Sequence, residues 1–208
     1  MASLTKIAKI APQSSALFVC DIQERFKGVI WQFPSVITVA NKMIKVSRHL
    51  DIPIVVTEQY PKAFGPTVQE LDVSDAAINM SKTKFSMFLP EVESVLKKNN
   101  TKSVILVGIE SHVCVLQTAL DLLENNYDVH VLADGVSSQN HSEIGIALQR
   151  MRSAGATITT SESIMFQLVQ DSKHEKFKGI SALVKEYMEA GKVNQILQKI
   201  GGSASANL

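Results

Sequence analysis

The sequence has very few cysteines, and this scarcity excludes one class of protein. Only Cys20 and Cys114 occur among its 208 residues, too few for a small scaffold that is held together by disulfides. The N-terminal residues 1–18 have no apolar core of signal-peptide length, and no run approaches the roughly 20 apolar residues of a membrane span. We therefore expect a reduced protein in the cytoplasm.

An excess of charge of either sign is also missing. The formal net charge is +1, which shows no bias toward nucleic acid, membrane surfaces or acidic ligands. Apolar residues make up 45% and charged residues 20% of the chain, as is ordinary for a globular protein with a sizeable core. The composition thus indicates neither nucleic acid nor a membrane as a partner.

Several signatures of cofactor, metal and serine-nucleophile sites are absent. The sequence contains no G-x-S-x-G elbow, no Walker loop and no G-x-G-x-x-G. The five histidines are scattered and show no metal-ligand spacing; they are His49, His112, His130, His141 and His174. We therefore expect no metal and no cofactor.

The sequence does contain a regular alternation of short apolar runs and helical patterns. The apolar runs predict strands, and residues at helical spacing predict helices between them. The expected strands are 16–22, 52–58, 103–109, 128–134 and 156–161, and the expected helices are 34–50, 114–126 and 141–155. This β-α-β-α order indicates one doubly wound domain, with a mainly parallel sheet between layers of helices.

Some segments depart from this alternation or mark its ends. Residues 58–80 are expected to form a glycine- and proline-bearing loop, long enough to predict a functional excursion or an oligomer contact. Asn140 and Glu143 are placed like a capping pair at the start of the helix 141–155, and Gly155 like its stop. The last residues, 201–208, are expected to be frayed.

Polar side chains stand at the ends of the predicted strands. Asp21 follows the first strand, Glu58 and Gln59 end the second, and Cys114 lies in the first turn of the helix after strand 103–109. Ligands of open α/β sheets bind beyond the carboxyl ends of the strands. A thiol at the start of a helix meets its positive end and free backbone N–H groups, which favour the nucleophilic thiolate. The position of Cys114 therefore suits a nucleophile.

The same residues have an ordinary structural interpretation. A free cysteine usually packs as a small hydrophobe, as we expect for Cys20 inside its strand. An aspartate after a strand commonly caps a helix or orders a loop. From position alone, Cys114 and Asp21 are thus either reactive groups or structural ones.

Three stretches taken together resemble the isochorismatase-like cysteine hydrolases. "CDIQERF" contains Asp21, "KTKFSMF" contains Lys82 and "GIESHVCVLQTALDLL" contains Cys114, in the order of that family's Asp, Lys and Cys signatures. "TEQYPKAFGPTVQEL" and "TTSESIMFQLV" are similar to the eukaryotic isochorismatase domain-containing proteins in particular. The resemblance runs from about residue 16 to about residue 185.

The resemblance implies a Rossmann-like three-layer α/β/α fold with a six-stranded, mainly parallel sheet, and a catalytic triad of Asp21, Lys82 and Cys114. Lys84 is the competing lysine, but only Lys82 has the family's spacing to an aromatic residue and a serine. The resemblance also implies an oxyanion hole made by the backbone N–H groups of Glu110 and Cys114, with a cis peptide between Ile109 and Glu110.

The implied reaction is hydrolysis of a small amide, carbamoyl or related acyl compound through a cysteine thioester. Nicotinamidases of the family carry a metal site with an Asp-x-His element after the second strand, and this chain has no histidine there. True isochorismatases cleave a vinyl ether and need no thiol. The alternative is a catalytically weak or inactive family member that acts as a binding module.

The remaining expectations concern the surroundings of the site. The residues expected to shape the substrate pocket are Gln23, Phe26, Gln59 and Tyr60, each of which could equally order a loop or lie on the surface. The hydrolase domain is expected at 15–190, between an N-terminal extension at 1–14 and a tail at 191–208.

The resemblance implies a homo-oligomer with residues 61–75, or the helix after strand 156–161, at the contact. The terminal "ANL" resembles a peroxisomal address without its basic residue, so the peroxisome is the alternative to the cytoplasm.

Overall fold

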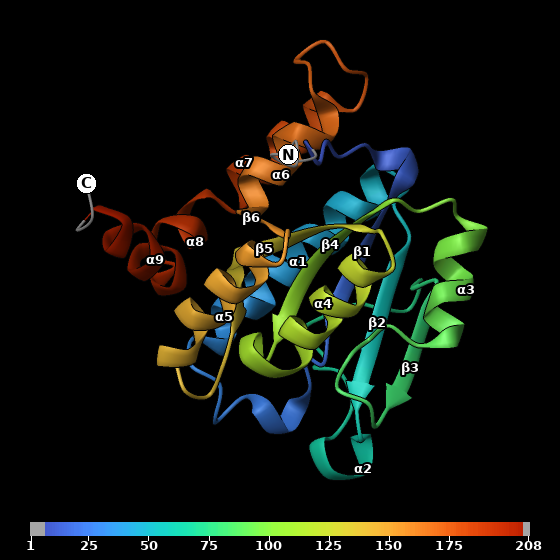
Figure 1. The fold of residues 1–208 in the computed structure, drawn as a ribbon. Helices are drawn as coiled ribbons and strands as arrows, with labels where there is room; N and C mark the ends of the chain where they lie inside the picture. Colours follow the sequence, from blue (N-terminus) through green and yellow to red (C-terminus); the bar gives the residue numbers. More distant parts are fainter. Residues whose placement is uncertain (1–6, 206–208) are drawn as a thin grey trace, which may run out of the picture.

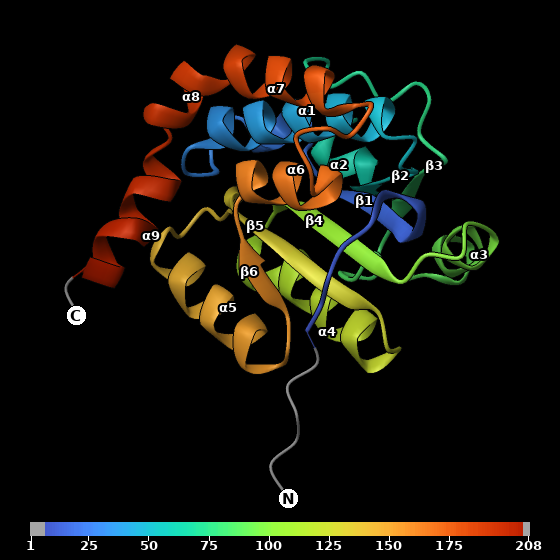
Figure 2. The same ribbon diagram turned by 90° about the horizontal axis from the view of Figure 1, so that it is seen from above.

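The computed structural model describes residues 7–205, which form one six-stranded sheet with helices on both faces (Figures 1 and 2). All strands run parallel, in the order β3-β2-β1-β4-β5-β6. Their bounds are β1 Ser15–Cys20, β2 Ile54–Gln59, β3 Ile78–Lys82, β4 Ser103–Ile109, β5 Asp128–Ser137 and β6 Thr157–Thr159. The predicted three-layer α/β/α fold is confirmed.

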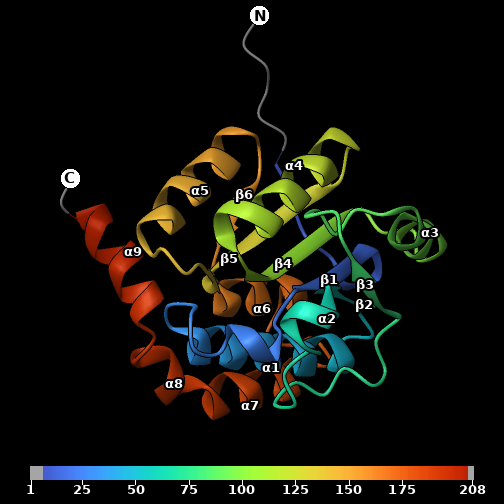
Figure 3. The same ribbon diagram turned by 90° about the horizontal axis from the view of Figure 1, so that it is seen from below.

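The central strands are the ones that the apolar runs identify. Every residue of β1 and β4 is buried, because helices cover both faces of the sheet. Each of the five runs that we read as strands corresponds to an observed strand, and β5 continues three residues farther than expected. The carboxyl ends of the strands lie together at one end of the sheet, which Figure 3 shows from below.

The segment 58–80 is more ordered than its composition indicates. It contains the short helix α2 (Pro61–Phe64), and β3 begins at Ile78. β3 is an edge strand whose side chains are mostly partly exposed or exposed, among them Asn79 and Ser81. Such a strand has no continuous apolar run, so the expectation of a loop up to residue 80 was wrong at its end.

Two helical layers cover the sheet. One core cluster includes side chains of α1, α6, α7 and α9, and the other includes side chains of α3, α4 and α5 (Figure 2). The helix bounds are α1 Phe33–His49, α3 Pro90–Lys98, α4 Leu116–Glu124, α5 Ser142–Ser153, α6 Ser161–Val169, α7 Phe177–Glu186, α8 Met188–Lys192 and α9 Gln195–Ser205. Three short turns complete the described chain: η1 Pro12–Ser14, η2 Glu24–Phe26 and the π-helical turn η3 Ser111–Val115.

The start of α5 differs in detail from the expected capping pair. The side-chain oxygen of Asn140 accepts from the Ser142 N–H at 3.1 Å, while the Glu143 N–H donates to the Asn140 carbonyl. No side-chain capping bond forms at the N-cap residue His141. Gly155 follows the helix with a φ of 109°, a conformation that glycine adopts without strain. The predicted stop is confirmed.

The C-terminal helices are anchored to the sheet by a polar contact. The Asp134 carboxylate, at the end region of β5, accepts hydrogen bonds from the backbone and the hydroxyl of Ser161. The Asp134 carbonyl accepts from the Asn194 side chain at 2.9 Å, and Ile196 is buried in the core. Part of the segment expected to be a tail therefore packs against the domain. The terminal "ANL", residues 206–208, lies outside the described residues.

Within residues 7–205, no helix is both long and apolar enough to span a bilayer.

Burial of one histidine makes stability depend on pH. His130 in β5 is fully buried, neither ring nitrogen has a hydrogen-bond partner among the described residues, and burial lowers its pKa although Asp128 opposes this. The unfolded chain takes up the proton near pH 6.5, whereas the folded chain resists it. Stability should therefore fall as the pH drops below about 6.5.

We expect His130→Leu to remove this acid sensitivity and to raise stability at neutral pH, because an unpaired buried polar group costs about 1–3 kcal/mol. The measurement is the urea midpoint at several pH values between 5 and 7.5. The exposed His141 supplies the control, since His141→Leu should keep the wild-type dependence of the urea midpoint on pH. A His130→Leu variant with the wild-type dependence would contradict the assignment.

Candidate active site

The site lies where the strand order reverses. β1 and β4 are neighbours although three helices and two strands separate them in sequence, and crevices at such switch points are where open α/β sheets bind ligands. A single glycine permits their close approach: a Cβ on Gly108 would lie 2.2 Å from the Cys20 carbonyl oxygen, and the φ of Gly108 is 127°. The chain beyond β4 therefore starts close against the end of β1.

Asp21 is the first residue after β1, and its side chain is enclosed. Only 1% of the residue is exposed, and its φ of 51° turns the chain sharply out of the strand. One carboxylate oxygen accepts from the Thr57 hydroxyl at 2.8 Å, and the other accepts from the Lys82 ammonium at 2.7 Å. Both oxygens of this buried carboxylate are thus hydrogen-bonded, as burial of a charge requires.

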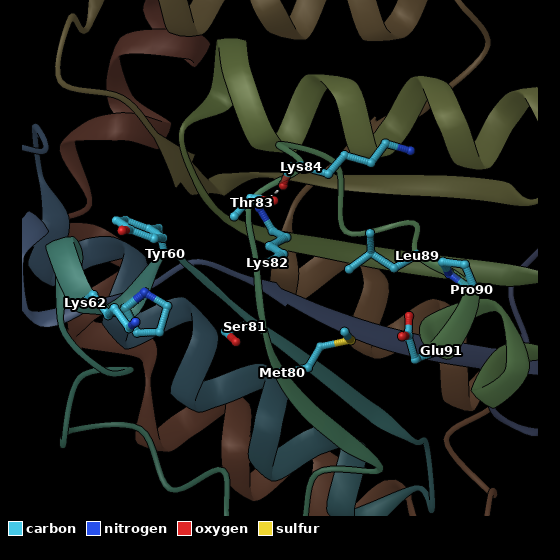
Figure 4. Close-up of a pocket in the computed structure, with 11 residues that line it drawn as sticks. Tyr60, Lys62, Met80, Ser81, Lys82, Thr83, Lys84, Leu89, Pro90 and Glu91 are labelled. Atoms are coloured by element: carbon cyan, nitrogen blue, oxygen red, sulfur yellow. Dashed lines mark hydrogen bonds between the residues drawn. The ribbon is translucent and has the colours of Figure 1, made fainter.

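Lys82 is the last residue of β3, and its side chain is fully buried. Besides Asp21, its ammonium donates to the Gln59 side-chain oxygen and the Phe85 carbonyl, each at 2.7 Å, and it lies 3.2 Å from the Lys84 carbonyl. Figure 4 shows the lysine beside the turn that contains Thr83 and Lys84. Lys84 itself pairs with Asp121 at the surface. Lys82, and not Lys84, therefore lies beside Asp21.

Cys114 occupies the fourth position of the turn η3, directly ahead of α4. The residue is 7% exposed. Its thiol lies close enough to lower the pKa of the Asp21 carboxyl and to raise that of the Lys82 ammonium. The Glu110 carbonyl accepts from the N–H groups of Val113 and Val115, so the turn closes around Cys114. The peptide bond between Ile109 and Glu110 is cis.

Thr118 connects this turn to the lysine segment. Its hydroxyl donates to the Cys114 carbonyl at 2.6 Å and accepts from the Met87 N–H at 2.8 Å. The carboxyl, the ammonium and the thiol come from three segments, residues 21, 82 and 114, that meet at one point. This is the arrangement a thiol nucleophile needs, with a base and a cation beside it.

A family model for the isochorismatase domain matches residues 15–163. The chain belongs to the isochorismatase family. It is 46% identical over 187 residues to isochorismatase domain-containing protein 2 of Xenopus laevis, an alignment that covers 89% of this chain and 91% of the relative. The predicted likeness to the eukaryotic isochorismatase domain-containing proteins is confirmed.

Solved structures agree with the fold of this isochorismatase-family protein. A structure described as MAR1 ribonuclease from Caenorhabditis elegans superposes with a TM-score of 0.81 at 49% identity, over 85% of this chain and 92% of that one. The YcaC gene product of Escherichia coli, described as an octameric hydrolase of unknown specificity, has a TM-score of 0.80 at 19% identity, over 97% of this chain and 98% of that one. The chain thus has an isochorismatase-family hydrolase fold.

In this isochorismatase-family site, burial and charge act in opposite directions on the two ionised groups. Burial raises the pKa of the Asp21 carboxyl, and the Lys82 ammonium only partly offsets this. Burial alone would lower the pKa of Lys82, but the acidic groups of Cys20, Asp21 and Cys114 together raise it. Asp21 is therefore a stronger base than an exposed aspartate, and Lys82 remains a cation.

The second thiol is also close to the carboxyl. Cys20 ends β1, is fully buried, and its sulfur donates to Asp21 at 3.6 Å. Burial and its hydrogen bond with Cys114 raise the pKa of Cys20 well above its ordinary value. Cys20 is thus held as a neutral thiol, which agrees with the packing role expected from its place in the strand.

The four expected pocket residues have different surroundings. Gln23 is fully buried and hydrogen-bonded to the backbone of Gln59, and Gln59 contacts Lys82. Phe26 stacks on Phe64 with ring centroids 4.9 Å apart. Tyr60 is half exposed, and its backbone N–H donates to the Lys82 carbonyl at 2.9 Å. A pocket role for these four residues stays a prediction.

A groove of about 550 Å³ runs beside the site, along the edge strand β3. Tyr60 and Lys62 lie on one side of β3, and Leu89, Pro90 and Glu91 lie on the other (Figure 4). Its lining includes neither Asp21 nor Cys114. Among the described residues, no cluster of three or more histidine, cysteine or acidic side chains is arranged to hold a metal ion.

Sequence reasoning missed several polar residues near the strand ends, among them the hydrogen-bond partners of Asp21 and Cys114. Thr57 and Thr118 lie inside a strand and a helix, where a threonine has no pattern that marks it as functional. His112, whose Nδ1 lies 3.0 Å from the Ser138 hydroxyl, is one of five scattered histidines with no pattern in the sequence. Only the folded structure shows that these residues lie near the strand ends.

The buried ion pair gives a stability prediction. Lys82→Met should destabilise the protein by about 3–5 kcal/mol at neutral pH, because it leaves the Asp21 carboxylate buried without a cation. In this variant the folded-state pKa of Asp21 rises further above the unfolded value of about 3.9. The loss of stability should therefore shrink as the pH falls from the folded-state pKa of Asp21 toward its unfolded-state pKa. Below the unfolded-state pKa, Asp21 is neutral in both states.

Chemical denaturation at pH 5 and pH 8 measures this difference. The control is Lys84→Met, which removes an exposed pair two residues away and should cost less than about 1 kcal/mol. Equal losses in the two variants would contradict a buried Asp21–Lys82 pair.

Proposed function

We propose that this chain is a cysteine hydrolase that cleaves a small amide, carbamoyl or related acyl compound through a thioester on Cys114. The observation that carries the proposal is the meeting of three groups at one buried point. The Asp21 carboxyl accepts from the Lys82 ammonium at 2.7 Å, and the nearby Cys114 thiol affects the pKa of both groups. Membership of a family of hydrolases supports the reaction class.

In the proposed mechanism, Asp21 removes the proton from the Cys114 thiol. Its raised pKa makes it a better acceptor than an ordinary carboxylate, and Lys82 stabilises the thiolate. The thiolate attacks the carbonyl carbon and the carbon–nitrogen bond breaks, while Asp21 returns the proton to the leaving amine. Water then hydrolyses the thioester, which releases the acid and restores the thiol.

The tetrahedral intermediate carries an oxyanion that requires fixed donors. We assign this role to the backbone N–H groups of Glu110 and Cys114. The bonds from Val113 and Val115 to the Glu110 carbonyl support the assignment, because they fix the turn that carries both groups. Preorganised donors of this kind contribute without reorganising during the reaction.

The relative from Caenorhabditis elegans is named as a ribonuclease, which makes RNA a second candidate substrate. RNA binding relies on basic side chains that neutralise phosphates. The net charge of +1 gives this chain no such excess, so we favour a small acyl substrate and include RNA as a comparison. A binding module without catalysis is the other alternative.

The test is a screen of small primary amides, carbamoyl compounds and single-stranded RNA against the wild type, Cys114→Ala and Cys20→Ala. We expect hydrolysis of at least one amide or carbamoyl compound. Cys114→Ala should lower the rate by about a thousandfold or more, because it removes the nucleophile. Cys20→Ala, which removes the neighbouring thiol, should keep most of the activity.

Each other outcome of the screen contradicts the proposal in a specific way. Full amide hydrolysis by Cys114→Ala would remove Cys114 as nucleophile. RNA cleavage that is insensitive to Cys114→Ala, without amide hydrolysis, would favour the ribonuclease activity. A wild type that is inert toward every compound, while its Cys114 still reacts with iodoacetamide, would favour the binding module.

We also propose that the protein is a homo-oligomer in the cytoplasm, with residues 61–75 or α6 at the contact. The octameric state described for the YcaC gene product, which shares the fold, supports this choice. A monomeric mass by light scattering at micromolar concentration would contradict it. A peroxisomal location of a reporter that carries the last dozen residues would contradict the cytoplasmic assignment.

A further inference from the structure

The side-chain amide of Gln59 holds the ammonium of Lys82. Gln59 and Lys82 are paired across β2 and β3. The Gln59 side-chain oxygen accepts from the Lys82 ammonium at 2.7 Å, and its nitrogen donates to the Thr83 carbonyl at 2.9 Å. Both ends of the amide are therefore used within the protein.

Gln59 is in turn fixed by Gln23. The Gln23 side-chain oxygen accepts from the Gln59 N–H at 2.7 Å, and its nitrogen donates to the Gln59 carbonyl at 3.0 Å. The same nitrogen donates to the Gly65 carbonyl at 2.7 Å. β1 ends at Cys20, opposite Thr57, so the side chain of Gln23 replaces the strand that Gln59 no longer has beside it.

These contacts determine where the lysine charge is placed. An ammonium has three protons, and the three shortest contacts of Lys82, each 2.7 Å, go to Asp21, Gln59 and the Phe85 carbonyl. Gln59 and the carbonyl are neutral, so they fix the nitrogen without neutralising its charge. The four-carbon stem of a lysine is flexible, and without Gln59 the ammonium loses one of the two short neutral contacts and keeps the Phe85 carbonyl and the longer one to the Lys84 carbonyl.

We propose that Gln59, clamped by Gln23, is a positioning residue that holds the Lys82 ammonium beside Asp21 and Cys114. This inference rests on the proposed function, in which Lys82 stabilises the Cys114 thiolate. It reassigns Gln23 and Gln59, which we expected in the substrate pocket, to the support of the catalytic lysine.

The test uses alkylation of Cys114, which requires no substrate. Iodoacetamide labelling is followed by peptide mass spectrometry from pH 5 to pH 9 in the wild type, Gln59→Met and Lys82→Met. In Gln59→Met we expect the pH of half-maximal labelling to rise, with labelling at pH 7 slower by about tenfold, because a nearby cation that favours the thiolate is less well held. The double variant should be no slower than Lys82→Met alone, because Gln59 acts through Lys82.

A matched control separates this effect from a general loss of stability. Gln167→Met makes the same change on the exposed surface of α6, where the Gln167 side chain donates to the Ser163 hydroxyl, and should leave the profile unchanged. If Gln59→Met does not fold, Gln59→Asn keeps the amide but is too short to reach Lys82, and should shift the profile in the same direction. An unshifted profile in a folded Gln59 variant would overturn the inference.

The inference and the proposed function fail in different ways. A shifted alkylation profile in a protein that hydrolyses no amide would keep Gln59 as the positioning residue and remove the hydrolase. If an amide is hydrolysed, the positioning role predicts a lower kcat in Gln59→Met with little change in KM. A raised KM with an unshifted alkylation profile would instead make Gln59 a substrate contact.

Discussion

The buried ion pair between Asp21 and Lys82 is the constraint on which this site depends. Both side chains are removed from water, and neither charge is tolerable there without the other. Their contact joins the end of β1 to the end of the edge strand β3, across β2. The hydrogen bonds from Thr57 and to Gln59 come from the intervening strand, so the three strand ends are held as one unit.

The pair also explains why a thiol is placed where it is. The chain leaves β4 close against β1 because Gly108 has no side chain to keep the two strands apart. The turn that follows, η3, brings Cys114 near Asp21 and Lys82. In the proposed mechanism, a base with a raised pKa and a fixed cation act on a thiol at the start of a helix and remove its proton. The same three groups would be a costly way to build a structural core.

The sequence predicts Asp21 and Cys114 as site residues better than it predicts Lys82. Asp21 and Cys114 stand at the ends of strongly apolar strands, so the rule that ligands bind at strand ends selects them from the residues alone. Lys82 ends a partly exposed edge strand whose polar residues give no strand signal, and only the resemblance to a family identifies it. The hydrogen bonds between Gln23 and Gln59 depend on the point at which β1 ends beside β2. The periodicity of the sequence does not predict this point. The sequence likewise does not show that His130 destabilises the fold, because this effect arises only when the ring is buried without a hydrogen-bond partner.

The central claim is that the Asp21–Lys82 pair activates the Cys114 thiol. The most direct measurement is the rate of iodoacetamide labelling of the two cysteines at pH 7 and 25 °C, in the wild type and in folded Lys82→Met. Cys20 serves as the internal reference because it is buried in the same region. The account predicts that Cys114 is labelled much faster than Cys20 in the wild type and loses most of this advantage in Lys82→Met. Equal labelling of Cys114 in the two proteins would contradict it.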